Sequence, residues 1–187
     1  GAVLPQADHL AQWDGANWSS LGTDANGALV GGYANNWVKA IAVIGTDVYV
    51  GGQFTNISNH GVNLPEGDNI AKWDGANWSA LGSNGAGNGS LQLDVYALAV
   101  SGTDLYAGGR FSNVNNNGTS LPTADYVAKW DTLTNTWSAL GSNGAGNGSL
   151  PASGYVNALA VSGGDLYVGG QFTNVNNGGT LIPEADY

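Results

Sequence analysis

Asparagine and tryptophan are the residue types in this sequence best suited to bind a ligand. An amide side chain both donates and accepts hydrogen bonds, which suits the hydroxyl groups of a sugar, and an indole ring can stack on a sugar face. Trp37 has no counterpart in the other copies of the repeat described below. The candidate ligand-binding residues are therefore Trp37, Asn84, Asn88, Asn115, Asn116, Asn117, Asn143 and Asn147. The alternative, which we favour for the asparagines, is that Asn and Gly serve left-handed turn conformations.

Catalytic and metal-binding residues are not predicted. The sequence has no Cys, and its two histidines, His9 and His60, are far apart and not repeated. The acids that recur from copy to copy belong to turns at strand starts, and no unrepeated pair of carboxylates suggests an acid–base couple. Arg110 is the one arginine, too few for the arginine cluster of a sialidase. We therefore expect a protein without enzymatic activity, metal or cofactor.

The charge balance and the lack of a long apolar run exclude two classes of partner. The net charge is −10, with four bases at Lys39, Lys72, Arg110 and Lys129. A nucleic-acid-binding protein needs a basic surface to neutralise phosphates, so nucleic acid is not an expected partner. No apolar run approaches the length that crosses a bilayer, so membrane insertion is not expected either. A sequence low in Lys and rich in Asn, Ser, Thr and Gly is typical of exported proteins, which predicts a secreted or cell-surface location.

The chain is built from one repeat of about 60 residues, which must position these side chains. LAQWDGANWSSLG (10–22) aligns with IAKWDGANWSALG (70–82) and VAKWDTLTNTWSALG (127–141). DVYVGGQFTNI (47–57) aligns with DLYAGGRFSNV (104–114) and DLYVGGQFTNV (165–175). Internal repeats of this period are typical of solenoids and propellers.

Each copy predicts four short antiparallel strands and no helix. In 38–45, Ala40 and Ala42 alternate with Ile41 and Val43, which is the period of a strand with a small and a large face. A Gly-Gly pair in the second strand predicts close approach of a neighbouring backbone or ring. The expected units are a half-unit at 9–22, full units at about 38–81 and 95–140, and a half-unit at 156–172. Long loops are expected at 55–69, 112–125 and 173–186, and at 82–93 and 141–154.

The order of motifs resembles the kelch-type β-propeller blade. An apolar strand is followed by Tyr-x-Gly-Gly, a variable segment, an aromatic-Asp turn and a Trp strand, with KWDTLTNTWSAL (129–140) as the nearest match. Trp stands where kelch blades usually carry Tyr before the Asp, so the resemblance is to a related bacterial secreted or surface repeat family. It implies an all-β propeller of four-stranded blades within a single repeat domain, 1–187.

Three blade equivalents are fewer than the four to eight of ordinary propellers. The terminal half-units are complementary, and exposed strand edges must be covered. Two copies can share half-units in a closed ring, copies can add head to tail in a filament, or the chain can be a fragment of a larger propeller protein whose remaining blades cover the ends. The predicted function is a non-enzymatic extracellular structural or assembly protein, with self as partner. The alternative is a glycan- or protein-binding, lectin-like propeller that uses the Asn- and Gly-rich loops of one face.

Overall fold

The computed structural model describes residues 9–22, 37–151 and 154–185. The prediction of an all-β chain is confirmed, since the described elements are antiparallel strands and two single-turn 3-10 helices, Pro65–Gly67 and Pro183–Ala185. Within these residues no helix has the length and apolar character needed to cross a bilayer.

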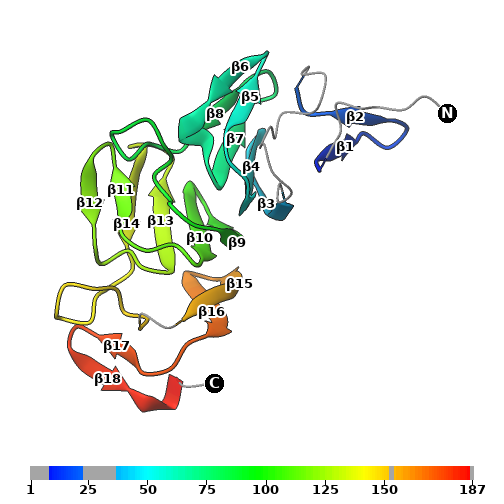
Figure 1. The fold of residues 1–187 in the computed structure, drawn as a ribbon. Coiled ribbons are helices and arrows are strands. Elements are labelled where there is room, and N and C mark those ends of the chain that lie inside the picture. Colours follow the sequence, from blue (N-terminus) through cyan, green and yellow to red (C-terminus); the bar gives the residue numbers. More distant parts are fainter. Residues whose placement is uncertain (1–8, 23–36, 152–153, 186–187) are drawn as a thin grey trace.

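Two four-stranded antiparallel sheets form the middle of the molecule (Figure 1). In each sheet, consecutive long strands are neighbours, as the repeat predicts. The first sheet has the order β3(Trp37–Ile44), β4(Asp47–Gln53), β7(Ile70–Trp73), β8(Trp78–Ala80). The second sheet has the order β9(Val95–Ser101), β10(Asp104–Gly109), β13(Val127–Asp131), β14(Thr136–Ala139).

A strand pair lies at each end of this arrangement. The N-terminal pair, β1(Ala11–Trp13) and β2(Trp18–Ser20), corresponds in sequence to the two outer strands of a sheet. The C-terminal pair, β15(Tyr155–Ser162) and β16(Asp165–Gln171), corresponds to the two inner strands. The described units follow one another in an open arc, and they do not close into a ring (Figure 1).

The connections between the second and third strands are not the long loops that we expected. Each contains a small hairpin, formed by β5(Ile57–Asn59) with β6(Val62–Leu64), β11(Val114–Asn116) with β12(Thr119–Leu121), and β17(Val175–Asn177) with β18(Thr180–Ile182). The sequence analysis was wrong here because three-residue strands separated by a two-residue turn are too short to show periodicity. The hairpins of the two complete sheets lie beside the outermost strands β8 and β14.

We call the first strand of each unit, β3, β9 or β15, its innermost strand, and the last strand of a complete sheet, β8 or β14, its outermost strand. Neighbouring units stack a small face against a large face, as the alternation of residues in the innermost strand predicts. A Cβ on Gly51 would lie 2.6 Å from a methyl carbon of Val95 on the next sheet, and one on Gly108 would lie 2.5 Å from Val156 on the C-terminal pair. The Gly-Gly pairs therefore allow the close approach that the sequence predicts. Most of the core lies at these junctions, where tightly packed apolar side chains supply the main stabilisation.

Candidate functional site

A bulge in each innermost strand places one extra residue at the same end of three neighbouring units. The pairing register shifts around Lys39 in β3, around Tyr96 in β9 and around Asn157 in β15. A bulged residue is left out of the strand ladder and its side chain is redirected, which is why bulges often lie beside functional sites. All three residues line one hollow of about 880 Å³.

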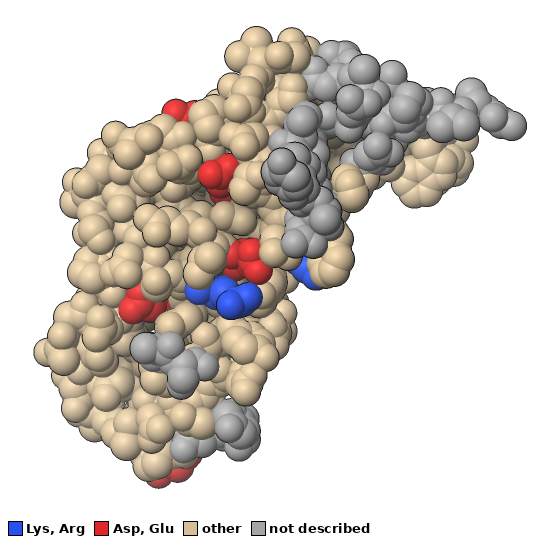
Figure 2. Space-filling view, in the orientation of Figure 1, with Lys and Arg blue, Asp and Glu red and all other residues tan. Residues whose placement is uncertain are grey.

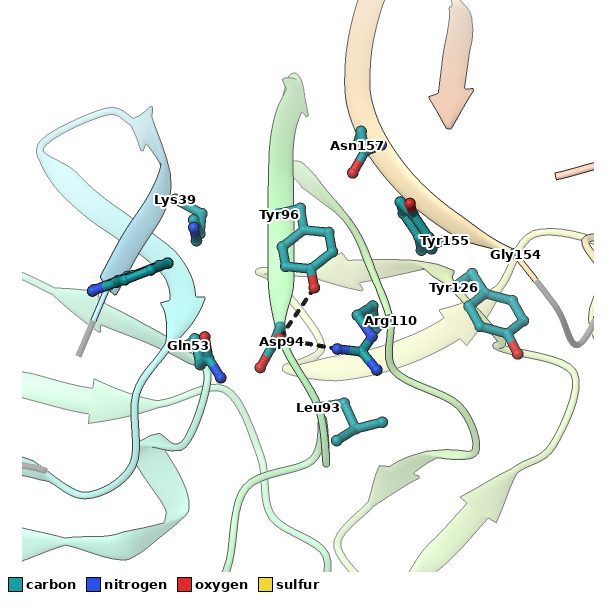
Figure 3. Close-up of a pocket in the computed structure, with 11 residues that line it drawn as sticks. Lys39, Gln53, Leu93, Asp94, Tyr96, Arg110, Tyr126, Gly154, Tyr155 and Asn157 are labelled. Atoms are coloured by element: carbon teal, nitrogen blue, oxygen red, sulfur yellow. Dashed lines mark hydrogen bonds and ion pairs between the residues drawn. The ribbon is translucent and has the colours of Figure 1, made fainter. Parts of the chain in front are cut away.

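The same hollow is lined by the residues two positions before the bulge and by the residue just after the Gly-Gly pair. Trp37, Asp94 and Tyr155 occupy equivalent positions at the start of the innermost strands, while Gln53 and Arg110 follow the Gly-Gly pairs. Figure 3 shows these side chains around one opening, together with the bulged residues. We call this opening, defined by these eight residues, the polar hollow.

Asp94 is the electrostatic centre of the polar hollow. Its Oδ2 accepts a hydrogen bond from the Tyr96 hydroxyl at 3.1 Å and lies 3.9 Å from Nη1 of Arg110, as the dashed lines of Figure 3 mark. Burial raises the pKa of Tyr96, and the neighbouring Tyr96 and Asp94 raise the pKa of Arg110. Asp94 therefore lies within reach of both Tyr96 and Arg110, with the Tyr96 hydroxyl protonated and the Arg110 guanidinium charged at neutral pH.

The basic residues of the chain divide into two pairs. Lys72 bonds Asp47 at 3.0 Å and Lys129 bonds Asp104 at 3.1 Å, each across two strands of a sheet. Lys39 and Arg110 instead line the polar hollow, where the Lys39 ammonium lies 4.2 Å from the centre of the Trp37 ring. Figure 2 shows basic atoms gathered near the middle of one face, beside acidic atoms.

Of the predicted ligand-binding residues, the structure places Trp37 in the polar hollow and the seven asparagines outside its lining. The side chains of Asn84 and Asn143 accept backbone N–H groups of their own loops, including those of Asn88 and Asn147. These contacts are the turn-forming role that we favoured for the asparagines.

The other three asparagines lie in or next to the hairpin of the second sheet. Asn116 clamps the outermost strand, since its side chain accepts the backbone N–H of Trp137 at 2.7 Å and donates to the Trp137 carbonyl at 2.8 Å. Asn117 accepts the N–H and hydroxyl of Ser83 from the preceding Gly-rich loop. The side-chain oxygen of Asn115 is buried and has no hydrogen-bond partner among the described residues.

Sequence analysis missed the other members of the polar hollow, although a signal was present. The bulged position reads Lys, Tyr and Asn in the three copies, and the position two residues earlier reads Trp, Asp and Tyr. Near-identical repeats that differ at positions on one end of the innermost strand indicate that these positions do not serve packing alone. Only Trp37 was singled out on this basis, because the bulge itself leaves no mark in the alternation.

A second, apolar hollow of about 350 Å³ lies between the second sheet and the C-terminal pair. We define it by the apolar side chains that line it: Leu140, Leu150, Leu166, Val168, Phe172 and Val175. Their counterparts one repeat earlier, in the same order, are Leu81, Leu91, Leu105, Ala107, Phe111 and Val114, and all of these belong to the core that surrounds Trp137. The apolar hollow is therefore lined by the equivalents of the residues that surround Trp137, and no equivalent of Trp137 fills it among the described residues.

Tryptophans of the outermost strands are buried in the complete sheets and exposed in the N-terminal pair. Trp78 and Trp137 are 3% and 2% exposed, and each donates its indole N–H to a leucine carbonyl of the preceding unit, Leu21 at 3.1 Å and Leu81 at 2.8 Å. Trp18, their counterpart, is 59% exposed. The molecule thus presents an uncovered tryptophan at one end and a matching apolar hollow at the other.

No family model matches the sequence, and no curated protein matches it either. Among the described residues, no group of three or more His, Asp or Glu side chains is placed to hold a metal ion.

Proposed function

We propose that the chain is a structural or assembly protein of the β-propeller type, without enzymatic activity, whose copies associate by completing each other's terminal strand pairs. The observation that carries this proposal is the match between exposed Trp18 and the apolar hollow. In an assembly, Trp18 of one copy fills the hollow of another and donates its indole N–H to the Leu140 carbonyl, as Trp137 does to Leu81.

Strand pairing supports the same arrangement. Strands β4 and β10 each pair with an inner and an outer neighbour, whereas β16 pairs with β15 alone among the described strands. Tyr49 lies opposite Lys72, and Tyr106 lies opposite Lys129. Transferring this register to the two terminal pairs places Tyr167 of one copy opposite Gln12 of the other. An open strand edge of this kind is a template for pairing with a further chain.

The flat faces of the terminal units are also complementary. Ile41 and Val43 on β3 are each 54% exposed, whereas their counterparts Leu98 and Val100 pack against the core between the two sheets. The C-terminal pair exposes the small face of Ala158 and Ala160. A second copy that contributes its C-terminal pair beside β1 would cover Ile41 and Val43 with this small face, as the first sheet covers Leu98 and Val100.

A second copy is the occupant that fits both ends at once. The N-terminal pair already occupies the position of an outer half-sheet, since Leu21 is buried in the first sheet's core and accepts the Trp78 bond. The N-terminal pair lacks the two inner strands of a sheet, which the C-terminal pair of another copy can supply. The C-terminal pair lacks the two outer strands, which the N-terminal pair can supply. Two copies give a closed six-bladed ring with two-fold symmetry, and an unclosed series of copies gives a filament. A secreted or cell-surface location suits a protein of this composition.

The test combines a cysteine pair with solution mass. The chain has no native Cys, so the double variant Gln12→Cys/Tyr167→Cys is expected to form a disulfide between copies, because directly opposed residues on neighbouring antiparallel strands lie within disulfide reach. Light scattering of the unmodified chain is expected to give twice 18.9 kDa for a ring, or much larger species for a filament.

The control pair is Gln12→Cys/Ser162→Cys, in which the second cysteine lies on β15, one strand farther from the open edge. It is expected to stay unlinked under the same mild oxidation. A monomeric mass together with no cross-link in the first variant would overturn the proposal, and it would favour further repeat units of a longer chain as the cover of both ends. Equal cross-linking of both variants would also overturn the proposed register.

A further inference from the structure

The polar hollow combines three kinds of chemistry that the packing of the sheets does not require. It holds both of the bases that are not paired across a sheet, Lys39 and Arg110. It exposes aromatic rings, with Trp37 52% exposed. It also presents polar acceptors and donors on Asp94, Gln53 and Asn157. Each of these groups comes from a position at which the repeats differ.

The local charge has the opposite sign to that of the chain. Lys39 and Arg110 against Asp94 leave one net positive charge in the lining of the polar hollow, within a chain of net charge −10. A ligand with a carboxylate is therefore drawn to this place and repelled by the rest of the surface. Polyphosphates and nucleic acids need several bases in a row, which this lining does not offer.

The remaining groups suit a ligand with hydroxyls and an apolar ring face. The Trp37 ring is open to solvent and already carries a cation on one side, and Tyr96 meets Tyr155 edge to face at 6.3 Å between ring centres. Asp94, Gln53 and Asn157 supply acceptors and donors for hydroxyl groups. The volume of about 880 Å³ falls within the range of small-molecule sites, roughly 300–1,000 Å³.

We propose that the polar hollow binds an acidic saccharide, with Arg110 and Lys39 on the carboxylate of a uronic acid residue, Trp37 or Tyr155 against the sugar ring, and Asp94 and Asn157 on its hydroxyls. Asp94 pairs with Arg110 at 3.9 Å and accepts the Tyr96 hydroxyl hydrogen bond, so it links two of the groups that line the polar hollow. The proposal does not depend on association between copies, because all of these residues belong to one chain.

The repeat itself supplies the test variants. Arg110→Gln introduces the residue that stands at the same position in the other two copies, Gln53 and Gln171, so the fold is expected to tolerate it. Lys72→Gln is the matched control: it removes the same charge outside the polar hollow, and Gln12 is its natural counterpart in another copy. Trp37→Tyr likewise introduces the residue that stands at the equivalent position of the third copy, Tyr155.

Binding of a galacturonic acid trisaccharide is measured by titration calorimetry, beside the neutral galactose trisaccharide of the same linkage. The unmodified chain is expected to bind the acidic sugar at least about tenfold more tightly, and Arg110→Gln is expected to lose about tenfold in affinity, because it removes the charge that pairs with the carboxylate. Lys72→Gln is expected to bind within about twofold of the unmodified chain. Added salt is expected to weaken the binding of the acidic trisaccharide and to leave the binding of the neutral trisaccharide unchanged.

Three results would overturn the inference. These are equal affinity for the acidic and neutral sugars, equal loss in Arg110→Gln and Lys72→Gln, and no binding of either sugar by a chain whose circular dichroism matches that of a folded β protein. Because mass and cross-linking are measured without any sugar, failure here leaves the assembly proposal untouched, and failure of assembly leaves this one untouched.

Discussion

The carboxylate of Asp74 holds the turn between β7 and β8 by accepting two backbone N–H groups, from Ala76 at 2.8 Å and Asn77 at 2.6 Å. Asp14 and Asp131 hold the corresponding turns of the other units in the same way. In each case the backbone hydrogen bonds lower the pKa of the carboxyl below its ordinary value of 3.8. These three aspartates therefore make the stability of the protein more sensitive to acid than is usual for exposed carboxyl groups.

Asp74→Asn is expected to remove part of this acid sensitivity. A group whose pKa is depressed by folding contributes stability above its unfolded pKa, and that contribution is lost as the pH falls through the folded value. Asn keeps an oxygen acceptor but does not titrate, so the unmodified chain should be the more stable at pH 7. The difference should shrink as the pH falls below the ordinary value of 3.8 and should vanish once the pH lies below the lowered folded pKa. Urea unfolding at pH 7 and at a series of pH values below 3.8 measures this, and a pH-independent difference would contradict it.

At the scale of the element, the tryptophan of the outermost strand joins each unit to the one before it. Trp137 is buried with Leu81, Leu91 and Phe111. Its indole N–H donates a hydrogen bond to the carbonyl of Leu81, which follows the last strand of the preceding sheet. The bond crosses 56 residues of sequence, so it is available only when two units are stacked. It is therefore a contact that stabilises the stack as well as the individual sheet.

Trp137→Phe is expected to cost more stability than Trp130→Phe. Both substitutions shrink a buried ring of one tilted pair, whose centres lie 5.3 Å apart, but only the first removes the bond to the Leu81 carbonyl. The difference between them should be about 1 kcal/mol, the typical net contribution of a hydrogen bond. Denaturant midpoints at constant slope measure it, and equal losses would show that ring volume alone matters.

The sequence predicted the long strands of each unit and missed the bulge and the small hairpin that each unit also contains. The alternation of Ala40 and Ala42 with Ile41 and Val43 identified the innermost strand and its two faces, because burial on one side enforces that period. The bulge at Lys39 was not predictable, since one extra residue changes the register without changing the composition. The hairpin at Ile57–Leu64 was missed because its two three-residue strands are too short to show a period.

The candidate site was predicted to a smaller extent than the fold. Trp37 was selected because it breaks the repeat, and it lies in the polar hollow, whereas Asn116 was selected for its chemistry and binds the Trp137 backbone instead. Amide side chains satisfy backbone groups as readily as ligands, so their type alone does not reveal their partner. Asp94 and Arg110 meet only because β9 and β10 pair, which a linear reading of the chain does not display.

At the scale of the whole molecule, one asparagine position distinguishes contacts within the chain from contacts between copies. Asn59 and Asn116 accept the backbone N–H of the outermost-strand tryptophan in their own sheets, Trp78 and Trp137. Asn177 is the third member of this set, and the C-terminal unit has no outermost strand of its own among the described residues. In the proposed assembly, its partner is the backbone of Trp18 from another copy.

Asn116→Ala and Asn177→Ala are therefore expected to act on different equilibria. Asn116→Ala removes two hydrogen bonds within the chain and should lower the free energy of unfolding by about 1–2 kcal/mol. Asn177→Ala should leave the unfolding of dilute, dissociated protein unchanged and raise the dissociation constant between copies about tenfold, because its contact forms only across the interface. Sedimentation equilibrium over a range of concentrations, with unfolding measured at the lowest, separates the two effects. If Asn177→Ala associates as tightly as the unmodified chain, the terminal strand pairs do not meet in the register of the complete sheets.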